Sequence, residues 1–176
     1  MRRTGLAVAA VLVAVTACGQ PQQQLGSGTM GTNAEVGDVV LRNVFVEAPP
    51  GPAYQAEEDA VVRLVMFTRS GKPDQLVAVR SGDARQVVMR ADRDCDGTSE
   101  EVGSLTVPVD DAGLGRGGLA YHLVLVDFTD EVLAGTTVPV DFTFRDAGST
   151  RVSAMVEATA DGDGPTPLGC DRAGRQ

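Results

Sequence analysis

Short apolar runs that alternate with other residues cover most of the chain from Val36 onward. In "TVPVDFTF", residues 137–144, every second residue is Val or Phe and most of the others are polar. This period of two turns one face of a β-strand toward a core and the other toward solvent. Similar runs rich in Val, Phe and Thr predict further strands, at residues 38–48, 60–69, 75–81, 85–91, 104–109, 120–128 and 150–158.

Turn-forming segments separate these predicted strands. Examples are "APPGPA", "RSGKPD", "DDAGLGRGG" and "RDAGST", all rich in Gly, Pro, Asp or Ser. No window of the chain shows a convincing helical period, and no internal repeat is present. About eight strands with hairpin-like spacing predict an all-β fold, an antiparallel sandwich or barrel.

The N-terminus has the pattern of an export signal. Arg2 and Arg3 precede an uncharged apolar stretch at residues 4–17, which is shorter than the roughly 20 residues of a membrane-spanning helix. The stretch ends in "VTAC", which resembles the bacterial lipobox, a motif whose cysteine is lipidated. We therefore expect a signal peptide at residues 1–17 and lipidation of Cys18; the alternative is an ordinary signal peptide with a chance cysteine.

Composition divides the remainder of the chain. Residues 18–35 are rich in Gln, Gly, Ser and Thr, which predicts a disordered tether between the lipid anchor and the domain. Residues 36–160 contain the predicted strands and are long enough for one domain with a core. Residues 161–176 form a Gly- and Pro-rich tail.

The charge of the chain excludes one class of partner. Its formal net charge is −9, and removing residues 1–17 takes away two arginines and no acid, so the mature chain carries −11. Binding of nucleic acid needs Lys and Arg to neutralise phosphates, so we expect no nucleic-acid partner. Lys72 is the only lysine among the 15 basic residues, a preference for Arg that is typical of a GC-rich genome, as in actinobacteria.

Two cysteines besides Cys18 remain, Cys95 and Cys170. Exported domains meet oxidising conditions, where two such cysteines usually pair. We expect a disulfide that fastens the tail to the domain; two free thiols acting as soft metal ligands are the alternative.

An acidic loop surrounds Cys95. Asp92, Asp94, Asp96 and the following glycine fit the start of a calcium loop, in which alternate side chains supply oxygen ligands, and Glu100 is a further candidate ligand. The position of the bidentate Glu is a glycine, and no helix is predicted on either side. Calcium binding at about 10⁻⁴–10⁻³ M and a solvated acidic turn are both open alternatives.

A family resemblance covers nearly the whole domain, from Val36 to about Ala158. The segment "YHLVLVDFTDEVLAGTTVPVDFTFRDAGSTRVSAMVEA" resembles the second half of PCu(A)C-type periplasmic copper chaperones, and "VGDVVLRNVFVEAPPGP" resembles their opening strand and proline-rich turn. The resemblance implies a cupredoxin-like, antiparallel Greek-key β-sandwich. It also implies a copper site built from two His and two Met, which are soft donors suited to Cu(I).

The copper ligands of that family are mostly replaced in this chain. The resemblance places Arg90 at the first His, Glu100 or Glu101 at the first Met, His122 at the second His and Val124 at the last Met. A guanidinium stays protonated and has no lone pair to donate, so the sequence predicts a degraded copper site with His122 as its remnant. His122 is interpreted first as an ordinary strand histidine, with a residual metal ligand or a proton carrier as the alternative. Met66, Met89 and Met155 are interpreted as core residues.

The sequence therefore predicts a lipid-anchored protein on the outer face of the cell membrane, acting as a non-catalytic binding or accessory module. One histidine and no nucleophile or phosphate-binding motif argue against an enzyme. The membrane is the expected partner through the lipidated N-terminus, and a protein partner in the cell envelope is not identified. Copper is not expected as a cofactor. Two alternatives are kept: a copper metallochaperone with unrecognised ligands, and a calcium-stabilised structural lipoprotein.

Overall fold

A computed structural model describes residues 31–94, 96–109 and 120–158 of the chain. Every regular element in this part is a β-strand, so the predicted all-β class is confirmed. The strands are β1 (Thr32–Val36), β2 (Val39–Val46), β3 (Ala53–Tyr54), β4 (Ala60–Thr68), β5 (Asp74–Ser81), β6 (Ala84–Asp92), β7 (Glu100–Glu101), β8 (Leu105–Val107), β9 (Ala120–Phe128), β10 (Val132–Leu133), β11 (Thr137–Phe144) and β12 (Gly148–Val156).

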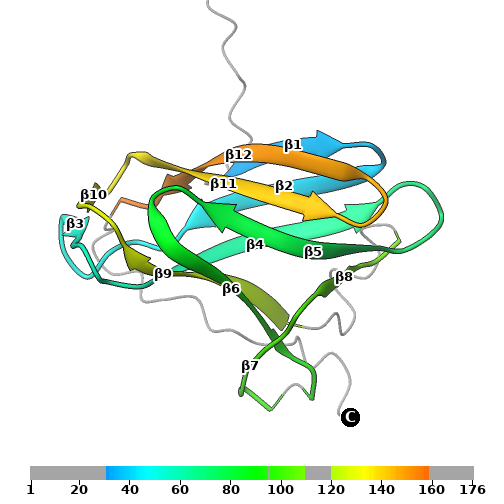
Figure 1. The fold of residues 1–176 in the computed structure, drawn as a ribbon, viewed down its shortest axis with the longest axis horizontal. Helices are drawn as coiled ribbons and strands as arrows, with labels where there is room; N and C mark the ends of the chain where they lie inside the picture. The colour runs from blue at the N-terminus through cyan, green and yellow to red at the C-terminus, as the bar shows by residue number, and fades with distance from the viewer. Residues whose placement is uncertain (1–30, 95, 110–119, 159–176) are drawn as a thin grey trace, which may run out of the picture.

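Ten of these strands form one continuous sheet in the order β7-β6-β9-β4-β2-β12-β11-β5-β8, with β1 added beside β2 (Figure 1). β3 and β10 form a separate two-stranded sheet. Only two residues join β5 to β6, although these strands lie near opposite ends of the order. The sheet must therefore curl to bring its ends together, and its inner face encloses the core.

The predicted antiparallel sandwich is wrong in two respects. The large sheet is mixed, because β12 runs parallel to β2 and pairs Met155 with Phe45 and Val156 with Val46. Its hydrogen bonds also form one curled sheet instead of the two stacked sheets of a sandwich. Local alternation identifies a strand but not its partner, and the β2–β12 pair joins the two ends of the domain.

All eight predicted runs contain a strand, whereas the short strands β1, β3, β7 and β10 were not predicted. Four of the five residues of β1 lie in the stretch interpreted as tether, so regular structure begins four residues before the predicted boundary at residue 36. Its sequence "TNAEV" is half polar, yet β1 pairs with β2, and the Asn33 Oδ1 accepts the backbone N–H of Asn43 at 3.0 Å. Asn43 lies at a β-bulge and has a φ of 51°.

The core follows the alternation of the strands. In β11 the residues with even numbers are all buried, as predicted. Met66 and Met89 are buried, which confirms them as core residues, whereas Met155 is 40% exposed and its predicted place in the core is wrong. The largest fully buried side chains are those of Phe128, Phe142, Leu41, Met66, Leu76, Leu123 and Leu125.

Candidate functional site

The strand register places three of the predicted copper-position residues in one row across the sheet. Arg90 on β6 lies directly opposite His122 on β9, and Glu101 on β7 lies opposite Arg90 on its other side. Directly opposed residues in an antiparallel pair point to the same face. Glu100 precedes Glu101 on β7, and its side chain therefore points to the opposite face of the sheet. Val124 lies two positions after His122 on β9.

His122 lies where two strands of the sheet separate. The last pair of the ladder between β4 and β9 is Val62 with Leu123, and His122, the residue that precedes Leu123, has no partner on β4 in this ladder. Beyond this point the Tyr121 hydroxyl accepts the backbone N–H of Met66 at 2.9 Å and bridges the two strands. His122 is 4% exposed, so its imidazole is buried, and its role as a remnant of the copper site stays a prediction.

Two guanidinium groups act on this imidazole from either side. Burial lowers the pKa of His122, and the positive charges of Arg63 on β4 and Arg90 on β6 lower it further. The ring is therefore neutral at pH 7 and retains a lone pair. A cation bound to that lone pair would face two fixed positive charges, which is the opposite of what a copper site needs. We call Arg63, His122 and Arg90 the cationic row.

Both arginines of the cationic row are held in place by other groups. The Arg63 guanidinium donates from Nε to Glu47 Oε1 at 2.6 Å, and its Nη2 lies 2.5 Å from the same oxygen. The Arg90 Nε donates to the Ser99 Oγ at 3.1 Å, and its Nη2 donates to the Ser99 carbonyl. Neither side chain is free to swing away and make room for a metal ion without losing these bonds.

Sequence reasoning missed Arg63 and Glu47. The sequence carried a signal, because Arg63 interrupts the apolar run "AVVRLVM". In the structure this residue takes a half-buried position on β4. Its place beside His122 depends on the registers of β2, β4 and β9, which only the tertiary structure supplies.

The acidic loop is a hydrogen-bonded turn in its described part. The buried Asp92 carboxylate accepts the backbone N–H of Asp96 at 3.2 Å and that of Gly97 at 2.9 Å. Asp96 in turn accepts the N–H of Thr98 at 2.7 Å, and Asp94 is exposed. These bonds use carboxylate oxygens that a calcium ion would need, and calcium binding stays a prediction.

Among residues 31–94, 96–109 and 120–158, no group of three or more His, Cys, Asp and Glu side chains is placed to hold a metal ion. No helix in this part of the chain is long and apolar enough to span a bilayer. Cys18, Cys95 and Cys170 lie outside the described residues, as does the predicted tail at 161–176, so lipidation and the disulfide stay predictions.

Solved structures share this fold. The structure described as "Copper-bound PCuAC domain from PmoF2" has a TM-score of 0.56 and 20% identity, and the match covers 72% of this chain and 98% of that one. "Apo PCuAC domain from PmoF1" has a TM-score of 0.57 and 17% identity, and covers 72% and 99%. At this identity the likeness establishes the fold alone, and it agrees with the PCu(A)C resemblance found in the sequence.

Among curated proteins no significant match was found. A protein family does match the chain over residues 39–156, which spans β2 to β12, and it is described as "Putative lipoprotein LpqE-like". The match covers well over half of the chain and nearly all of the curled sheet, and a lipoprotein family agrees with the lipobox at residues 15–18. The chain therefore belongs to the LpqE-like family of lipoproteins.

Proposed function

We propose that this lipoprotein is a non-catalytic binding or accessory module whose copper-chaperone-like fold no longer carries copper at the usual position. The observation that carries the proposal is the cationic row, in which Arg63 and Arg90 lie on either side of the neutral, buried His122. One imidazole without a second soft donor is a weak copper ligand, and two guanidinium groups oppose a cation there.

The proposal includes a location. Lipidation of Cys18 would hold the protein on the outer face of the cell membrane, since each buried methylene of the acyl chains adds about 0.8 kcal/mol of membrane affinity. Membership of a lipoprotein family supports this placement. The tether would then connect the lipidated Cys18 to β1, whose first residue is Thr32. A protein of the cell envelope is the expected kind of partner.

A competition titration tests the loss of copper. The purified protein competes for Cu(I) with a chromophoric chelator, and the copper-binding PCuAC domain of PmoF2 serves as the positive control. We expect no submicromolar Cu(I) affinity for this chain, because its only described imidazole is flanked by two cations. Submicromolar binding, or copper retained by protein purified from copper-fed cells, would show a metallochaperone with other ligands and would overturn the proposal.

A calcium-stabilised lipoprotein is kept as a second proposal because Asp94 and Glu100, at ligand positions of the calcium-loop pattern, are exposed. Calorimetric titration and thermal melting with millimolar Ca²⁺ test it. A rise in melting temperature that Asp94→Asn and Glu100→Gln remove would support calcium binding. No heat and no rise would leave Asp92 with a purely structural role as the acceptor of the turn.

A further inference from the structure

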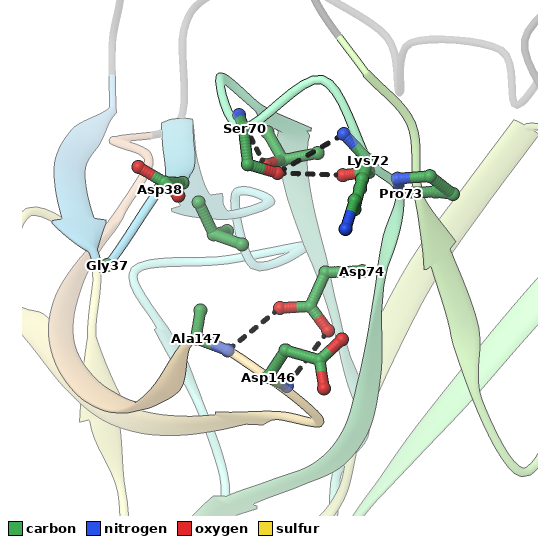
Figure 2. A pocket seen from close by; sticks show the side chains of 10 residues that line it. Gly37, Asp38, Ser70, Lys72, Pro73, Asp74, Asp146 and Ala147 are labelled. Carbon is green, nitrogen blue, oxygen red and sulfur yellow. Dashed lines mark hydrogen bonds between the residues drawn. The ribbon is translucent and has the colours of Figure 1, made fainter.

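Three chain segments line a partly open cleft at one end of the sheet, and it shares no residue with the cationic row. They are the β1–β2 turn at Gly37, the β4–β5 loop at residues 70–73, and the β11–β12 turn at Asp146 and Ala147. Figure 2 shows these side chains around a common space, whose volume is about 410 Å³. Ligand clefts usually have volumes of about 300–1,000 Å³.

The walls of this cleft are rigidly built. Asp74 is 7% exposed, and its carboxylate accepts backbone N–H groups from Gln75 at 2.6 Å, Asp146 at 3.1 Å and Ala147 at 3.0 Å. This carboxylate joins the β11–β12 turn to the start of β5. On the opposite wall the Ser70 hydroxyl donates to the Lys72 carbonyl at 3.0 Å and fixes the loop.

Three charged side chains of the cleft are not used by the fold. Within the described part of the chain, the side chains of Lys72, Asp38 and Asp146 make no hydrogen bond and no ion pair. In Figure 2 the Lys72 side chain extends from the β4–β5 loop toward Asp74, yet no carboxylate oxygen lies within 4.0 Å of its ammonium group. Lys72, Asp38 and Asp146 are therefore exposed charges at this cleft that are unpaired among the described residues.

We propose that this cleft binds a small zwitterion that carries one carboxylate and one ammonium group, as free amino acids and short peptides do. Lys72 would bind the carboxylate, and Asp146, with the remaining acceptor capacity of Asp74, would bind the ammonium. A simple cation would meet the Lys72 ammonium, and a simple anion would meet the carboxylates. The cleft therefore selects a ligand in which both charges occur together.

Calorimetric titration of the intact lipidated protein in detergent micelles tests this with matched ligands. L-Alanine and L-alanyl-L-alanine carry both charges, N-acetyl-L-alanine carries only the carboxylate, and L-alaninamide carries only the ammonium. We expect saturable binding of at least one zwitterion and binding at least about tenfold weaker for both singly charged analogues. Binding of the dipeptide alone identifies peptides as the source, and stronger binding of the single residue identifies free amino acids.

Variants separate binding from folding. Lys72→Met and Asp146→Asn each remove one charge of the cleft without removing a side-chain hydrogen bond, and each should weaken zwitterion binding by about tenfold or more with an unchanged melting temperature. Arg80→Gln, at an exposed position on β5 outside the cleft, is the control and should bind as the wild type does. The proposal is overturned if neither zwitterion binds, if one singly charged analogue binds equally well, or if Lys72→Met keeps full affinity.

Discussion

At the scale of single residues, the surroundings of His122 in the fold differ from those in an unfolded chain. Burial and the charges of Arg63 and Arg90 lower its pKa below the ordinary value of 6.5. As the pH falls, the unfolded chain therefore binds the proton first. The contribution of His122 to stability is complete above about pH 6.5 and is lost as the pH falls toward the lowered pKa, by at most about 1.4 kcal/mol per pH unit.

This linkage predicts that His122→Gln makes unfolding less dependent on pH. The charged groups near the ring that can also contribute are Arg63, Arg90, Glu47 and Glu101, and all of them remain in the variant. Urea unfolding at about pH 7.5 and about pH 5 measures the difference. We expect the wild type to lose more stability than the variant between these conditions, and equal losses would contradict the lowered pKa.

Single residues also show which parts of the site could be predicted from the sequence. The family resemblance placed Arg90 and His122 at two ligand positions of one copper site, because both lie in long strands whose positions along the chain are unambiguous, and the structure adds that they are paired across β6 and β9. Arg63 could not be predicted as their neighbour, since the β-bulge in β2 and the early end of the β4–β9 ladder decide what lies beside His122. The cleft around Lys72 was missed because it joins three turns that are far apart in sequence.

At the scale of elements, the β11–β12 turn depends on a side chain from another strand. Burial by itself raises the pKa of Asp74, but the three backbone N–H bonds to its carboxylate together outweigh burial and lower it. Asp74→Ala leaves those N–H groups without their acceptor, which should cost about 1–3 kcal/mol of unfolding free energy. Chemical denaturation near neutral pH measures this cost, with Asp146→Asn as the control.

The sign of the pH effect provides a second check on Asp74. Because its pKa is lowered, its stabilising contribution is present above the ordinary value of 3.8 and is lost as the pH falls through the lowered pKa. The difference between wild type and Asp74→Ala should therefore shrink in strong acid. A difference that stays constant down to that range would mean that the carboxylate charge is not what holds the turn.

The junction between tether and domain rests on one close backbone contact. A Cβ added at Gly31 would lie 2.6 Å from the Cα and the carbonyl carbon of Asn43, closer than any normal contact. Gly31→Ala should push the start of β1 off the bulge of β2 and cost about 1–3 kcal/mol. Gly51→Ala is the matched control, because nothing lies within 4 Å of its added Cβ. Equal stability of the two variants would show that β1 tolerates the displacement.

Strand length explains which elements the sequence revealed. The strands of eight or nine residues were all predicted, because each contains several periods of the two-residue alternation. The two-residue strands β3, β7 and β10 contain at most one period, so no pattern can identify them. The parallel pairing of β12 with β2 was missed for a different reason: hairpin-like spacing predicts neighbours along the chain, and these strands are its first and last long ones.

At the scale of the whole molecule, the cationic row exists only because the sheet assembles strands from different parts of the chain. Arg63, Arg90 and His122 belong to β4, β6 and β9, and the sheet order places β9 between the other two. The cleft likewise needs β1, β2, β4, β5, β11 and β12 together. A covalent link that stabilises the closed fold would therefore stabilise both the cationic row and the cleft.

The predicted disulfide between Cys95 and Cys170 would be such a link, although both residues lie outside the described part of the chain. It would close a loop of about 75 residues and, in the chain-entropy model, add roughly 4 kcal/mol before strain. Mass spectrometry of the mature protein without reductant should find no alkylatable thiol at these two positions, and reduction should lower the unfolding free energy. The double variant with both cysteines changed to Ser should match the reduced protein in stability. Two alkylatable thiols in the untreated protein would refute the bridge, and the tail would then have no covalent hold on the acidic loop.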